Sequence, residues 1–156
     1  MEVDAMLCDY CQAAENKLFV NGAGVSRSWV GPEPPHMIKL GLAALIRVLY
    51  TATNQAHTIT ITLVTEDGKP VIPHVPEGMP EPAPIGVSAS FNVGRPAILV
   101  PGEEQTYPLA ANFELGLREV GGYKFVIAID GSEVKDLPVR VAVPPPGMSL
   151  VQSRAS

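Results

Sequence analysis

Apolar and polar residues alternate along most of this chain, and the clearest case is residues 121–143. Two apolar stripes run through this segment, formed by Tyr123, Phe125, Ile127 and Ile129, and by Leu137, Val139, Val141 and Val143. Successive side chains of a strand point to opposite faces, so each set predicts one buried stripe. Asp130-Gly131 lies between the stripes, and both residue types tolerate positive φ. The segment therefore predicts a β-hairpin, with residues 132–135 able to lengthen or bulge its turn.

A two-stranded hairpin is not stable alone in water, so other strands must cover its buried stripe. The same alternation predicts strands over 2–10, 17–30, 57–65, 85–93 and 105–113, with a turn at 12–16 and a connection at 115–120. Glycines at 22 and 24 predict a bend inside the second of these strands. The chain is thus predicted to be all-β, a single antiparallel β-sandwich of about eight or nine strands. The domain is expected to span residues 1–146, followed by a flexible C-terminal tail over 147–156.

Residues 37–50 fit both a helix and a strand. With period two, the apolar set is unbroken: Ile38, Leu40, Leu42, Ala44, Ile46, Val48 and Tyr50. A helix would place Lys39 and Arg47 about 80° apart, which is also tolerable. Gly41 and the strands on both sides favour one long strand.

Further along the chain, the segment Pro70 to Pro84 contains six prolines. It is predicted to be an irregular connection, because proline cannot donate to a ladder.

The balance of charge limits the possible partners. Charged residues make up 17% of the chain, against about 25% in an average soluble domain. So few charges suggest that a partner, or another copy, covers part of the surface; solvation by Ser, Thr, Asn and Pro is the alternative. The net charge is −5 and the eleven Lys and Arg residues are scattered. Nucleic acid and anionic membrane are therefore not expected as partners.

The first residues do not resemble a secretory signal, because Glu2 and Asp4 stand where positive charge is expected. The longest apolar stretch carries two charges and is too short to cross a bilayer as a helix. Two cysteines do not make a disulfide scaffold. We therefore expect a cytoplasmic protein that does not insert into membranes.

The chain contains little that predicts chemistry. Cys8 and Cys11 form a C-x-x-C, but a structural zinc site needs four ligands, and His36, His57 and His74 lie far apart in the sequence. The two thiols can meet only if the chain turns near Tyr10. Packing or chance is the favoured interpretation, with metal binding or redox activity as alternatives. There is no G-x-S-x-G and no group centred on a histidine, so no catalytic residue and no cofactor are predicted.

The strand positions that point away from the predicted core carry small, uncharged side chains. The candidate interface residues are Thr58, Thr60, Thr62, Ser88, Ser90, Asn92, Val126 and Ala128. Thr106, Pro108, Ala110 and Asn112 continue this pattern. Exposed sheets usually carry Lys and Glu, whereas a flat face of small residues suits stacking of sheets or subunits. A Thr-rich face that simply meets solvent is the alternative.

The chain resembles a group of short, uncharacterised bacterial proteins. The resemblance rests on Asp9-Tyr10, Lys17-Leu18, LIRVLY, TEDGKPV and GGYKFVIAIDG…LPVRV. It covers nearly the whole chain, and its closing pattern is similar to the last hairpin of many immunoglobulin-like sandwiches. It implies an immunoglobulin-like β-sandwich without known chemistry.

The function predicted from the sequence is a non-enzymatic, intracellular module for protein–protein contact or assembly. It is expected to form homo-oligomers through an uncharged sheet face or edge. A small-molecule or metal-binding module that uses Cys8 and Cys11 is the alternative.

Overall fold

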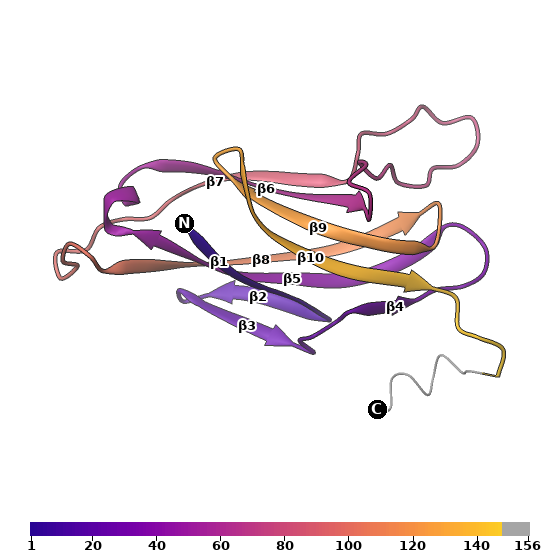
Figure 1. Ribbon diagram of the computed structural model, residues 1–156, viewed down its shortest axis with the longest axis horizontal. Helices are drawn as coiled ribbons and strands as arrows, with labels where there is room; N and C mark the ends of the chain where they lie inside the picture. The colour runs from indigo at the N-terminus through magenta and orange to yellow at the C-terminus, as the bar shows by residue number, and fades with distance from the viewer. Residues whose placement is uncertain (148–156) are drawn as a thin grey trace.

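Ten strands and one short 3-10 helix follow one another along residues 1–147, the part of the chain that the computed structural model describes (Figure 1). The strands are β1 (Glu2–Cys8), β2 (Tyr10–Ala14), β3 (Lys17–Asn21), β4 (Arg27–Trp29), β5 (His36–Leu49), β6 (Ala56–Thr65), β7 (Gly86–Asn92), β8 (Glu104–Leu117), β9 (Gly121–Ile129) and β10 (Ser132–Ala142). The helix η1 is Tyr50–Ala52. The all-β prediction is confirmed for these residues. The tail predicted for residues 147–156 lies, apart from Gly147, outside the described residues.

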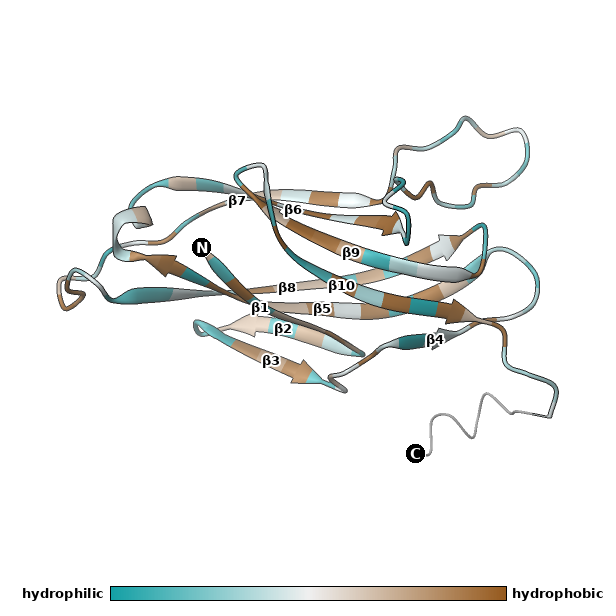
Figure 2. Ribbon diagram, viewed as in Figure 1, coloured by the Kyte–Doolittle hydropathy of each residue, from teal (hydrophilic) through white to brown (hydrophobic). Residues whose placement is uncertain are grey.

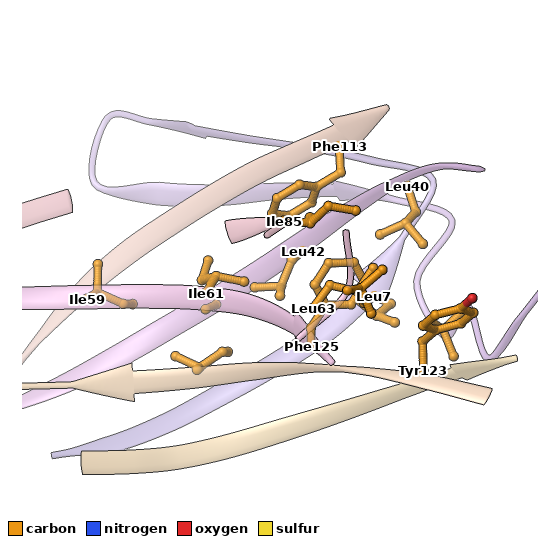
Figure 3. Packing of buried hydrophobic residues seen from close by; sticks show 14 of the residues in the cluster. Leu7, Leu40, Leu42, Ile59, Ile61, Leu63, Ile85, Phe113, Tyr123 and Phe125 are labelled. Carbon is orange, nitrogen blue, oxygen red and sulfur yellow. The ribbon is translucent and has the colours of Figure 1, made fainter. Parts of the chain in front are cut away.

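Two sheets face each other, and a small hairpin lies beside them. One sheet has the strand order β1-β5-β8, the other has the order β4-β10-β9-β6-β7, and β2 pairs only with β3. Buried side chains from both large sheets form one apolar core. Figure 3 shows Leu42 of β5 close to Ile61 and Leu63 of β6, between the two sheets. The apolar stripes predicted from the sequence therefore meet in this core.

The segment that fits both helix and strand is a strand. β5 pairs with β8 along its whole length, from His36 opposite Leu117 to Leu49 opposite Glu104. The sequence divided β8 into a strand and a connection, and that division is wrong. Residues 115–117 continue the ladder because β5, the partner strand, extends as far.

The closing hairpin has a two-residue turn, a length that the sequence left open. Ile129 pairs with Ser132, and the residues between them have positive φ, 50° at Asp130 and 83° at Gly131. A register shift between Glu133 and Lys135 supplies the bulge. Figure 2 shows the alternation near the end of β10, where brown and teal segments follow one another.

The first predicted strand and turn need correction. The chain bends at Asp9, whose backbone amide donates to the Asn21 and Gly22 carbonyls. β2 then begins at Tyr10 and continues through residues 12–14, which the sequence placed in a turn. The turn itself is Glu15-Asn16, with φ of 54° and 56°. Only two residues are needed for it, because Ala14 pairs directly with Lys17.

Candidate interaction surface

The predicted interface residues share the outer face of the five-stranded sheet. Thr58 and Thr60 of β6 pair with Ser90 and Ser88 of β7, and Thr60 also pairs with Ala128 of β9. Paired residues point to the same face, so Thr62 and Val126 extend this face at one end and Asn92 at the other. Val126 is buried and Thr60 and Ala128 are half-buried, whereas Thr58, Thr62, Ser88, Ser90 and Asn92 are exposed. We call this set the Ser/Thr face.

The β7 strand forms one edge of this sheet, and half of its backbone groups have no partner strand. The Asp130 amide donates to the Thr58 carbonyl, whereas the Leu63 amide donates to the Ile85 carbonyl. Backbone groups alternate in direction along a strand, so odd-numbered residues of β6 bond toward β7. In the observed register, Val87, Ala89 and Phe91 of β7 receive those bonds. The amides and carbonyls of Ser88 and Ser90 therefore point away from the sheet.

The other edges of the two large sheets carry features that discourage pairing, and β7 carries none. Charges, proline and short length are the usual protections of an edge strand. β4 has three residues and includes Arg27, β1 presents Glu2 and Asp4, and β8 contains Pro108. β7 reads GVSASFN, without proline or any charged residue. It is the least protected edge of the two large sheets.

An apolar groove lies where the edges β7 and β8 face each other. It has a volume of about 180 Å³ and is lined by Ile59, Ile61, Val87, Ala89, Leu109, Ala110 and Ala111. No ladder joins β7 to β8 within residues 1–147. Alternation within residues 85–93 predicts that Val87 and Ala89 point toward the core, but Val87 is 48% exposed and Ala89 is also exposed. The physical reason is that β7 lies at an edge that the three-stranded sheet does not cover.

Phe91 is the single buried side chain of β7. Its ring stacks on Tyr107 of β8, with 4.8 Å between centroids, and its other neighbour is the His57 imidazole at 5.5 Å. Phe91 thus fixes the C-terminal end of β7 to the core, Ile85 just before the strand is buried at the other end, and the residues between them are held by the ladder to β6.

His57 is itself held at both ring nitrogens. Nδ1 lies 2.7 Å from Asp130 Oδ2, and Nε2 lies 2.8 Å from the Ala52 carbonyl oxygen. The bond to the Ala52 carbonyl and the bond to Asp130 raise the pKa of His57, and they outweigh the opposing effect of burial. The Thr58 amide donates to Asp130 Oδ1 at 2.9 Å. That bond, followed by the His57 contact, holds the pKa of Asp130 below its usual value.

The thiols of Cys8 and Cys11 lie close together, because the chain bends at Asp9, next to Tyr10. A Cβ on Gly41 would lie 2.9 Å from the Cys8 sulfur and 3.1 Å from the Cys11 sulfur, so both thiols occupy the space that this glycine leaves. Both are free and buried, and the Cys11 thiol donates to the Leu42 carbonyl at 3.4 Å. Burial, followed by the neighbouring Cys11, raises the pKa of Cys8 to about 11.

A cysteine binds a metal ion as its thiolate. The raised pKa of Cys8 disfavours that form. Within residues 1–147, no three His, Cys, Asp or Glu side chains are grouped so that they could hold an ion. A metal or small-molecule role for Cys8 and Cys11 stays a prediction from the sequence.

Sequence reasoning found the Ser/Thr face but missed the groove and the His57–Asp130 pair. The groove depends on which strands become edges, and that follows from topology rather than from alternation. A signal for the pair was present, because His57 begins the most regular strand and Asp130 begins the clearest turn.

No helix in residues 1–147 has the length and apolarity needed to cross a membrane.

Comparison with known proteins gives a family without an assigned activity. No curated protein and no solved structure matches the chain. A family described as being of unknown function, DUF6941, matches residues 3–142, which is most of the sequence. The chain therefore belongs to the DUF6941 family.

Proposed function

We propose that this domain is a non-enzymatic assembly module that self-associates by pairing β7 with β7 of a second copy. The observation that carries the proposal is the unprotected β7 edge, where the amides and carbonyls of Ser88 and Ser90 point away from the sheet. Antiparallel pairing about a two-fold axis would satisfy these groups and join two five-stranded sheets. The Ser/Thr face would then continue from one copy to the next without an intervening charge.

The groove beside β7 supports the same contact. Val87 and Ala89 point toward the inner side of the edge and are exposed in a single copy. A neighbouring β7 would bring the same two side chains to the mouth of the groove and cover apolar surface there. β6 and β7 contain no Asp, Glu, Lys or Arg, so two copies of this edge would not repel each other.

We also propose that the fold is immunoglobulin-like. Such domains place strands A, B and E in one sheet, and strand C with the closing hairpin F–G in the other. The orders β1-β5-β8 and β10-β9-β6-β7, with β4 parallel to β10, follow this plan. The Tyr123 hydroxyl near the start of β9 donates to the Glu119 carbonyl at 2.5 Å. This bond is similar to the tyrosine corner of immunoglobulin-like domains. We further propose a bacterial origin and a cytoplasmic location.

Light scattering after size exclusion, over a wide dilution series of the untagged protein, tests the self-association. One chain has a mass of 16.5 kDa, and the proposal expects a defined species of twice that mass that dissociates on dilution. A monomer at every concentration would overturn the proposal.

Three variants locate the contact. Ser90→Pro removes an outward amide from the edge and leaves the ladder to β6 in place, so it should shift the equilibrium to monomer. Ser88→Lys with Ser90→Lys adds like charges at the edge and should do the same. The matched control is Gln12→Lys with Asn21→Lys, which adds equal charge on the exposed hairpin β2–β3 and should leave the mass unchanged. Dissociation by the control alone would place the contact elsewhere.

A further inference from the structure

The contacts of His57 require two protons on its ring. A neutral imidazole has one N–H donor and one bare nitrogen. Here both nitrogens face acceptors, the Asp130 carboxylate at 2.7 Å and the Ala52 carbonyl at 2.8 Å. In a neutral ring, the lone pair of the bare nitrogen would point at a lone pair of an acceptor oxygen. The side chain is only 7% exposed, so water cannot readily relieve this repulsion. The geometry is therefore that of an imidazolium.

The surrounding charges are few. Asp130, at the β9–β10 turn, is the one carboxylate bonded to the ring. The Met1 amino group, at the start of β1, opposes protonation. From the loop after β7, Arg95 bonds Thr53 Oγ1 and the Tyr50 carbonyl, next to Ala52. β7 and β8 contribute the uncharged Phe91 ring and, behind it, Tyr107.

We propose that His57 is a proton-operated clamp that fixes the edge strand β7 to the core. Its imidazolium joins three segments: the end of the helix η1, the β9–β10 turn and, through Phe91, the end of β7. Phe91 is the only buried side chain within β7, so the position of the imidazole affects how firmly this end of the edge strand is anchored. The biological use of the clamp rests on the proposed function, because it acts on the edge that would pair.

Loss of the proton removes one of the two bonds. The ring is then free to reorient, the contact with Phe91 loosens, and β7 opens more often. Opening and protonation are linked. The opening constant therefore rises by up to about tenfold per pH unit over the pH range in which the closed state keeps the His57 proton and the open state has lost it. Because the closed state binds the proton more tightly, acid closes the clamp and base opens it.

Asp130→Asn tests this assignment without disturbing the turn. Asn-Gly is a preferred pair for a two-residue hairpin turn, and asparagine tolerates the φ of 50°. Its amide oxygen can still accept from the Thr58 amide, and its NH₂ group can donate to a neutral His57 Nδ1. His57 Nε2–H then donates to Ala52. The variant should therefore keep the contacts and remove the need for the second proton.

Two measurements at dilutions where the protein is monomeric are required. Nitrogen chemical shifts of the imidazole report protonation, and hydrogen exchange of residues 86–92, corrected for intrinsic rates, reports opening. In the wild type we expect a His57 pKa above 6.5 and loss of β7 protection as the pH rises through it. In Asp130→Asn, His57 should titrate at lower pH and β7 protection should lose this dependence.

His36→Gln is the matched control. His36 is also buried, but within residues 1–147 only its Nδ1 has a partner, the Gly31 carbonyl at 2.9 Å, and one donor satisfies it. This variant should retain the pH dependence of β7. A neutral His57 at pH 6.5, or unchanged β7 exchange in Asp130→Asn, would overturn the clamp. Neither result depends on self-association, so a monomeric protein with a working clamp would reject only the proposed function.

Discussion

The side chain of Asn112 and the backbone of Cys11 exchange two hydrogen bonds across strands that are not paired. The Cys11 amide donates to Asn112 Oδ1 at 3.1 Å, and Asn112 Nδ2 donates to the Cys11 carbonyl at 2.8 Å. The side-chain amide thus acts as one extra rung of a ladder and fixes the hairpin β2–β3 to β8. Cys8, Cys11 and Ala43 form a small buried cluster beneath this hairpin.

Asn112→Ala should destabilise the protein by about 1–3 kcal/mol, because it removes both bonds and leaves backbone groups of Cys11 without partners. Urea unfolding measures the loss, and hydrogen exchange should locate it in residues 10–21. Asn92→Ala, at an exposed position of β7, is the control and should change stability by less than about 0.5 kcal/mol. Equal effects of the two variants would show that the Asn112 bonds contribute nothing specific.

Gly41→Ala should destabilise the contact between Asn112 and the hairpin β2–β3, because the added methyl group would clash with both Asn112 and Cys8. A Cβ at Gly41 would lie 2.9 Å from both Asn112 Oδ1 and Cys8 Sγ, closer than van der Waals contact permits. Overpacking of this kind typically costs about 1–3 kcal/mol. Gly94→Ala is the matched control, because nothing lies within 4 Å of its Cβ position. The two unfolding curves should separate, and coincidence would mean that the hairpin shifts to make room.

Alternation in the sequence was enough to predict most strands but not their tertiary surroundings. It placed Leu42 and Ile61 in the core and Thr60 on the opposite face, because strand geometry alone determines these directions. It treated Ala110 and Asn112 as part of an open face, whereas Ala110 packs against the cysteine cluster and Asn112 bonds the hairpin. Such contacts join residues 101 positions apart, and no local pattern encodes them.

The candidate surface was predictable in the same limited way. The Ser/Thr face follows from the parity of residues 58–62 and 86–92, which the sequence displays directly. The free amide of Ser90 does not, because it depends on β7 being the last strand of its sheet. The pairing of His57 with Asp130 likewise required the register of β6 with β9.

Arg95→Lys should weaken the loops at the end of the molecule that contains η1. The Arg95 guanidinium donates to Thr53 Oγ1 at 2.7 Å and to the Tyr50 carbonyl at 2.8 Å, and it lies 4.1 Å from the Tyr50 ring centroid. Lysine cannot reproduce the planar, forked geometry. We expect a loss of about 1 kcal/mol, measured by urea unfolding. Arg118→Lys, at an exposed ion pair with Glu81, should have a smaller effect.

Cys8 and Cys11 should be unreactive in the folded protein. Both are buried, which keeps reagent away from them. The pKa of Cys8 is raised to about 11, so little Cys8 thiolate is present near neutral pH. An aromatic disulfide reagent should release almost no thiolate signal from native protein and the signal of two thiols in urea. Rapid labelling of the native protein would contradict this prediction and would favour a redox or metal-binding role for the two cysteines.

The unfolding free energy should have a maximum in mildly acidic solution. His57 has a raised pKa in the folded state, so its contribution is fully present below its ordinary pKa of 6.5 and is lost as the pH rises through the folded value. Asp130 has a lowered pKa, so its contribution is present above its ordinary value of 3.8 and is lost as the pH falls through the folded value. Urea unfolding from pH 3 to 9 measures both limbs, and the one proton of His57 gives the alkaline limb a slope of at most about 1.4 kcal/mol per pH unit. Asp130→Asn should flatten both limbs relative to the wild type, whereas Asp67→Asn, at a second exposed carboxylate with a lowered pKa, should affect only the acid limb. An alkaline limb that survives in Asp130→Asn would assign the pH dependence to groups other than His57.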